Sequence, residues 1–122
     1  MSDKEAKEHA SDLKRALSDK ALEPDFESSI DARTLFDIEP LLLISYEREA
    51  HQLVKQIIDA ATWHPITPKR EEVLEAIRLA IISEVFLSQS KIEGDAYSFK
   101  ADMYHEKFNI KMTQIINQTT KD

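Results

Sequence analysis

Histidines and carboxylates that share helical segments are the residues of this chain that could hold a metal ion. Glu47 lies four residues before His51, and His105 lies directly before Glu106. Di-metal sites in helical bundles instead use a glutamate and a histidine three residues apart on each of two helices, with further inward glutamates. No glutamate here is followed by a histidine at that spacing. We therefore predict no bound metal, and interpret both histidines as surface or half-buried side chains.

Acid–base and nucleophilic catalysis also lack suitable groups in this sequence. Glu75 and Glu84 are the acids within the most apolar segment, and a separation of nine residues places them ~180° apart around a helix. We expect each to pair with a basic side chain or to reach solvent. Ser83, Ser88 and Ser90 have no histidine nearby in sequence, and no G-x-S-x-G motif occurs. We predict no catalytic residue and no enzymatic activity.

Composition excludes several further classes of site. The 122 residues suit one domain, and the absence of cysteine excludes disulfides, thiol chemistry and cysteine-based zinc sites. Gly94 is the single glycine, whereas phosphate-binding loops and dinucleotide fingerprints need several. We therefore expect no cofactor. The formal net charge of −7 repels phosphate backbones, so we expect no direct binding of nucleic acid.

Membrane and secretion signals are weak in this chain. The longest apolar run, within Ala76 to Leu87, is interrupted by charges and falls short of the roughly 20 residues that span a bilayer. The first residues, MSDKEAKEHASD, lack the apolar core of a signal peptide. We expect a soluble protein that is made in the cytoplasm and does not bind membranes.

The segment from Thr67 to Gln89 is apolar on almost every side, so it is predicted to form the central helix of the fold. Thr67 could cap the first turn and Pro68 suits the first helical position. Alanine replacement of Ile77 or Ile81 is expected to cost about 2–5 kcal/mol by leaving a cavity. A neutral result would instead make this helix an assembly face.

The chain before the central helix is predicted to hold an arm helix, a short element and one long amphipathic helix. Asp3 to Leu22 repeats small apolar residues at helical steps, namely Ala6, Ala10, Leu13, Leu17 and Ala21. Its thin stripe suggests a partly mobile, solvated arm; ordering by a partner is the alternative. Asp31 could cap a short turn before Pro40 opens the helix from Leu41 to Ala61. Trp63 in the following link is expected to cover one end of the core.

The last helix is predicted to follow a turn in which Gly94 adopts a left-handed conformation and Asp95 caps the next residues. Its apolar stripe consists of Tyr97, Ala101, Tyr104, Phe108, Met112 and Ile115. We interpret this stripe as core; partial exposure would make it a protein-binding face. The predicted fold is all-α: an antiparallel bundle of three long helices around the central apolar helix, plus an N-terminal arm helix. We divide the chain into 1–40, 41–116 and a frayed tail, 117–122.

The order of these features resembles tailed-phage head–tail connector proteins, the adaptors beneath the portal. The similarity covers Leu41 to Ile116: an amphipathic helix, the Thr67-Pro68 turn, EEVLEAIRLAIISEVFLSQS, a link with glycine, and AYSFKADMYHEKFNIKMTQI. The resemblance implies no catalytic residue, a subunit that packs against its neighbours in a twelve-fold ring, and loops or termini that bind the portal. It also implies that the subunit is a monomer until it binds the portal. No hairpin of the family's kind is evident, so Met1 to Pro40 is a hypothetical portal-binding element.

We therefore expect a non-enzymatic adaptor that binds proteins, in its most concrete form a connector subunit located in the virion. Its partners would be the portal, neighbouring subunits and tail components. The exposed faces of the helices from Leu41 to Ala61 and from Tyr97 to Ile116 are the expected contact surfaces. The alternative is a small acidic chaperone or regulator that holds one client helix in a groove lined by Leu53, Ile57, Tyr104 and Phe108.

Overall fold

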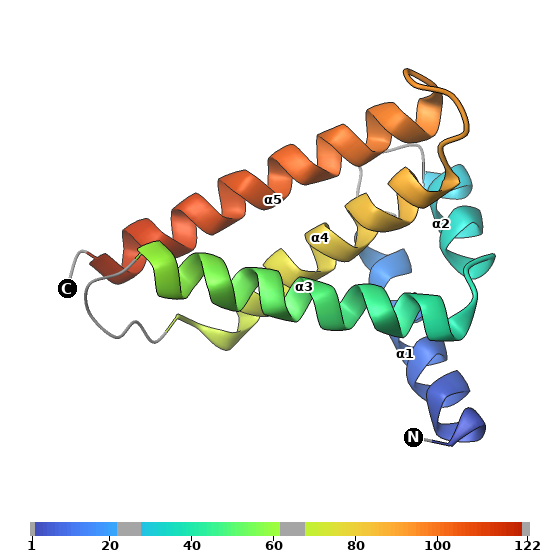
Figure 1. Cartoon of the computed structure of the whole chain (residues 1–122), viewed down its shortest axis with the longest axis horizontal. Helices are drawn as coiled ribbons and strands as arrows, with labels where there is room; N and C mark the ends of the chain where they lie inside the picture. The colour runs from blue at the N-terminus through green and yellow to red at the C-terminus, as the bar shows by residue number, and fades with distance from the viewer. Residues whose placement is uncertain (1, 22–27, 62–67, 121–122) are drawn as a thin grey trace.

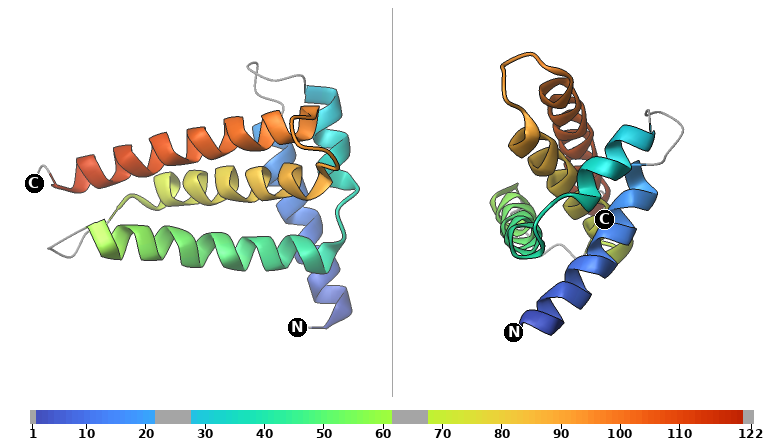
Figure 2. Two further views of the ribbon diagram at one scale, coloured as in Figure 1. Left: turned by 45° about the horizontal axis from the view of Figure 1, so that its top comes forward. Right: turned by 90° about the vertical axis from the view of Figure 1, so that its right-hand side faces the viewer.

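The computed structural model describes residues 2–21, 28–61 and 68–120, and the chain is all-α throughout these ranges. The five helices are α1 (Asp3–Ala21), α2 (Ser28–Phe36), α3 (Pro40–Ala61), α4 (Arg70–Gln89) and α5 (Ala96–Thr120). Successive helices α3, α4 and α5 run in alternating directions, with α4 beside both of its neighbours (Figure 1). Figure 2 shows these three helices side by side and α1 crossing them steeply. The predicted helical bundle is confirmed.

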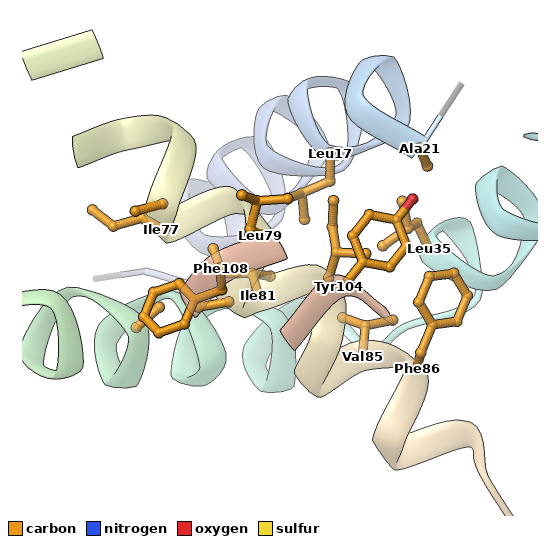
Figure 3. Close-up of a cluster of buried hydrophobic side chains, with 14 of the residues drawn as sticks. Leu17, Ala21, Leu35, Ile77, Leu79, Ile81, Val85, Phe86, Tyr104 and Phe108 are labelled. Atoms are coloured by element: carbon orange, nitrogen blue, oxygen red, sulfur yellow. The ribbon is translucent and has the colours of Figure 1, made fainter. Parts of the chain in front are cut away.

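The fold is organised around α4, as its apolar sequence predicts. This helix contacts each of the other four helices, most extensively α5. Its buried positions cover nearly the whole circumference: Ala76, Ile77, Leu79, Ala80, Ile81, Ile82, Ser83, Val85 and Phe86. Figure 3 shows how side chains from α1, α2 and α5 meet several of them. Because so little of α4 remains exposed, its own surface offers little room for a binding site.

The first turn of α4 differs from the prediction. The helix begins at Arg70, and Lys69 occupies the N-cap position in an extended conformation, without a side-chain capping bond. The Lys69 carbonyl instead accepts hydrogen bonds from the backbone N–H groups of Glu72 and Val73, both at 3.1 Å. Pro68 therefore precedes the helix, and its restriction of the backbone serves the link. The proposed cap Thr67 and the predicted core cover Trp63 lie outside the described residues.

Helix α1 has the predicted stripe and packs against the bundle through it. Ala6, Ala10, Leu17 and Ala21 are buried, and all but Ala6 belong to the same hydrophobic core as α3, α4 and α5. Three polar contacts add to this packing: His9 with Glu47, Lys14 with the carbonyl of Phe36, and Lys20 with Glu75. The described part of the arm is therefore docked through its stripe. The domain division at residue 40 stays a prediction.

The short element before α3 begins earlier than predicted. Helix α2 starts at Ser28, so Asp31 lies inside the helix and is not its cap. The predicted start of α3 is confirmed, because Pro40 is its first residue and the Glu39 carbonyl accepts a 3.0 Å bond from the Leu43 N–H. A proline suits this position because the first N–H groups of a helix lack intrahelical partners.

The link between α4 and α5 is organised by Asp95, as predicted. Its carboxylate accepts bonds from the backbone N–H groups of Ser98 (2.8 Å), Lys91 (3.0 Å) and Ile92 (3.3 Å), and from the Ser90 hydroxyl (3.0 Å). These bonds, that from Ser98 foremost, lower the pKa of Asp95 to about 2. Gly94 has a φ of 85°, the left-handed conformation expected of it.

The aromatic stripe of α5 is core, as predicted. Tyr104 and Phe108 are almost completely buried, and the Tyr104 ring stacks on Phe86 of α4 with centroids 5.6 Å apart (Figure 3). Ala101, Met112 and Ile115 are also buried. The Ser83 hydroxyl donates a 2.9 Å hydrogen bond to the Ala101 carbonyl, which adds a polar contact between the two helices. Within the described ranges, no helix is both long and apolar enough to cross a membrane.

Candidate protein-binding surfaces

The groups considered for metal binding and acid–base chemistry are dispersed over the structure. His51 and His105 are both exposed, on α3 and α5. Among the residues that the structure describes, no three His, Cys, Asp or Glu side chains gather closely enough to hold a metal ion. Glu75 pairs with Lys20 of α1 and lies 4.0 Å from Arg78, whereas Glu84 is exposed. Glu75 and Glu84 therefore point to different surroundings, as their spacing predicts.

The three serines considered as nucleophiles all form local structural contacts. The Ser88 hydroxyl donates to the Val85 carbonyl at 2.7 Å, one turn back in the same helix. Ser90 donates to Asp95, and Ser83 donates to the backbone of α5. Each hydroxyl is thus engaged with a carbonyl or carboxylate that supports the fold. The candidate surfaces that remain are exposed apolar residues on α5 and at the α2–α3 junction, and a groove between α3 and α5.

A second apolar stripe runs along α5 on the side opposite its buried face. It consists of Phe99, Met103 and Ile110, which are 68%, 37% and 52% exposed. Spacings of four and seven residues place them on one face of a helix, roughly 120° from Tyr104 and roughly 160° from Phe108. We call these three residues the outer stripe. It spans about 16 Å of helix, at 1.5 Å per residue.

Sequence reasoning missed the outer stripe because it assigned that side of α5 to charged residues. Lys100, Glu106 and Lys107 do lie outside the core stripe, but they surround apolar positions instead of forming a wholly polar face. The missed signal was the spacing of Phe99, Met103 and Ile110. A helix with two opposite apolar stripes carries more apolar surface than one core face requires.

A groove lies between α3 and α5, with α4 as its floor. Its volume is about 210 Å³, and the small residues Ala80 and Ser83 are at its base, each only 7% exposed. The remaining lining residues are Glu49, Ala50 and Leu53 of α3, Glu84 of α4, and His105 and Phe108 of α5. We call this depression the α3/α5 groove. Because Glu84 and Glu75 are ~180° apart on α4, the groove opens away from the side on which Lys20 of α1 binds.

The size and lining of the α3/α5 groove favour a side chain over a small-molecule ligand. Cofactor and substrate pockets occupy roughly 300–1,000 Å³, more than this groove offers. Leu53 and Phe108 contribute apolar walls, and Glu49 and Glu84 contribute carboxylates at the rim. No lysine or arginine is among its lining residues in the described part of the chain.

The structure brings together two of the four predicted protein-binding residues. Leu53, which is 40% exposed, and Phe108, which is buried, both line the α3/α5 groove. Ile57 is half-buried and packs against the core, outside the groove lining. Tyr104 is fully buried against Phe86 and has no surface to offer a partner in this conformation. The role of the four residues in binding stays a prediction.

A further set of exposed apolar side chains lies where α2 leads into α3. Phe36, Leu41 and Leu42 are 59%, 60% and 41% exposed at this junction.

Comparison of the chain with protein-family models, with curated proteins and with solved structures finds no match. Inference about function therefore rests on the surfaces of the molecule itself.

Proposed function

We propose that this protein is a non-enzymatic structural adaptor that acts through contacts with other proteins. Its most concrete form is a subunit of a tailed-phage head–tail connector, which binds the portal and assembles into a ring in the virion. The observation that carries the proposal is the outer stripe of α5.

The monomer does not use the outer stripe for its core packing. The opposite face of α5 already supplies Tyr104, Phe108 and Met112 to the core. Single exposed apolar residues are ordinary on protein surfaces, but several aligned along one helix typify an interaction face. Phe99 and Ile110 would each gain from burial, at ~25 cal/mol per Å² of apolar surface. A partner that covers the stripe would provide that burial.

Two different surfaces on one subunit also suit a ring. A ring that closes by rotation needs heterologous contacts, in which one patch of a subunit meets a different patch of the next. The outer stripe lies on α5, whereas the exposed apolar residues Phe36, Leu41 and Leu42 lie at the junction of α2 and α3. The net charge of −7 opposes contact between free subunits, which favours a monomer until a partner organises assembly.

The α3/α5 groove supports a second candidate function, a small acidic chaperone or regulator. Leu53 and Phe108 line an apolar depression between two helices, which is the geometry of helix-in-groove recognition. In that case the protein would form a small complex with one client helix and no ring.

Co-expression with the portal protein encoded in the same genome tests the proposal. Mass photometry and electron microscopy should show a monomer for the chain alone and a closed ring on the portal for the mixture. A genome without a portal gene, or a portal that does not bind the chain, would contradict the connector proposal. A complex of fixed small mass with another encoded protein would favour the chaperone.

A further inference from the structure

We propose that the α3/α5 groove binds a basic amphipathic helix of a protein partner. An apolar side chain of that helix sits between Leu53 and Phe108 above Ala80, and a lysine or arginine of the helix meets Glu49 and Glu84. The inference rests on the proposed adaptor function, because it specifies the chemistry of the partner that one surface receives.

The shape of the groove suits the insertion of an apolar side chain from another helix. Ala80 and Ser83 have small side chains, so the base of the groove lies close to the backbone of α4, while α3 and α5 form its walls. Neighbouring helices that leave a depression between them accept the apolar side chains of a third helix. A volume of about 210 Å³ suits an inserted side chain and is small for a cofactor.

The carboxylates at the rim of the groove favour a partner with basic side chains. Within the described residues, Glu49 and Glu84 take part in no ion pair, whereas Glu75 on the opposite side of α4 is paired with Lys20. The fold therefore pairs Glu75 with a lysine of the same chain and leaves Glu84 at the groove. Complementary charge beside an apolar contact directs encounter and sets the orientation of the bound helix.

The overall charge decides between a basic partner and a second copy of this chain. Each copy carries a net charge of −7, so self-association through an acidic rim brings like charges together. A basic helix gains from the same field and also from the two rim carboxylates. The groove therefore selects a partner with lysine or arginine beside its apolar face.

A synthetic peptide of 18 residues, with leucine on one helical face and lysine on the other, is a direct probe. Fluorescence anisotropy would measure its affinity for the full chain, and methyl NMR would locate it through Leu53 and Ala80. Two comparison peptides separate the contributions: one keeps lysine but replaces leucine with serine, and the other keeps leucine but replaces lysine with glutamate.

The matched variants are two double charge reversals. E49K/E84K alters the groove rim, and E8K/D12K makes the same change in net charge at exposed positions of α1. Thermal melting verifies that each variant folds. We expect E49K/E84K to weaken binding of the leucine–lysine peptide about tenfold or more, and E8K/D12K to weaken it much less. Both comparison peptides should bind more weakly to the unaltered chain.

Equal weakening by the two double variants, or equally tight binding of the serine–lysine peptide, would overturn the inference, because either result reflects net charge alone. NMR shifts confined to other surfaces, or self-association through the groove, would overturn it as well. A chain that forms a ring on the portal but does not bind the peptide leaves the proposed function standing without this inference. Peptide binding at the groove without portal binding leaves the inference standing and contradicts the connector function.

Discussion

The two faces of α5 have similar side chains and different roles. One face places Tyr104 and Phe108 in the core, at 0% and 1% exposure. The other places Phe99 and Ile110 at the surface, at 68% and 52% exposure. Both faces repeat apolar residues at helical spacing, so spacing alone does not tell a core stripe from an interaction stripe. What separates them is continuity and the surface that α4 provides.

The bundle buries the face that it can cover without enclosing an unpaired charge. The core stripe from Ala101 to Ile115 has an apolar residue at each helical step, and it meets Phe86 and Ser83 of α4. The outer stripe has Glu106 between Met103 and Ile110. Burial of that carboxylate without a partner would carry a large desolvation cost. The outer stripe therefore suits an interface in which a partner supplies the opposite charge.

The largest expected effect comes from a pair of identical substitutions on the two faces. Phe108→Ala should lower the free energy of unfolding by about 3–5 kcal/mol, because it leaves a cavity between α4 and α5. Phe99→Ala should change it by no more than about 0.5 kcal/mol, because the ring is mostly in solvent. Urea denaturation would measure both. Equal losses of unfolding free energy in the two variants would contradict the assignment of one face to the core and the other to the surface.

The same contrast applies to α4. Ile81→Ala should cost about 2–5 kcal/mol, and so should Ile77→Ala, because both side chains are buried. Leu87→Ala is the control, since Leu87 is exposed on the same helix. Chemical denaturation again gives the free energies. A neutral Ile81→Ala variant would mean that α4 is open in the free chain and serves as an assembly face.

A smaller effect is expected at the turn that orients α5. Gly94→Ala should cost about 1–2 kcal/mol, because the φ of 85° is unfavourable for a residue with a Cβ atom. No neighbouring atom lies within 4 Å of the added Cβ, so backbone strain is the whole cost. Thermal melting would detect the loss. An unchanged melting temperature would show that the link rearranges without penalty.

The smallest effect is a dependence on pH at Asp95. Its pKa in the fold, about 2, is below the ordinary 3.8, so the charged form is stabilised. That stabilisation is complete above pH 3.8 and is lost as the pH falls through about 2. The melting temperature should therefore fall more between pH 5 and pH 2 for the natural chain than for Asp95→Asn. Asp102→Asn, an exposed change on α5, should retain the natural profile.

Local sequence signals accounted for most of the helices and for one link. Periodic apolar residues predicted α1, α3, α4 and α5, and Pro40 and the pair Gly94–Asp95 marked boundaries through backbone and capping preferences. The predicted start of α4 at Pro68 was wrong, because a proline is equally compatible with a link and with a first turn. Asp31 failed as a cap because α2 continues on its N-terminal side.

The candidate binding surfaces were harder to predict, for a physical reason. The α3/α5 groove joins Leu53 and Phe108, which are far apart in sequence, and it exists because small residues of α4 lie between α3 and α5. Helical spacing gives the face of each residue but not the separation between helices. Tyr104 was assigned to a groove from spacing alone, whereas its stacking on Phe86 uses the ring within the core.

Removal of the outer stripe tests most directly whether this face of α5 is an interface for ring assembly. The triple variant F99Q/M103Q/I110Q exchanges three apolar side chains for polar ones that favour helix, and D102Q/N109Q/T113Q is its control at exposed positions of α5. Mass photometry of each with the portal protein is the measurement, after thermal melting has verified folding. We predict that the stripe variant folds normally but forms no ring, while the control assembles like the natural chain. A stripe variant that assembles fully would contradict the claim that this face is an interface.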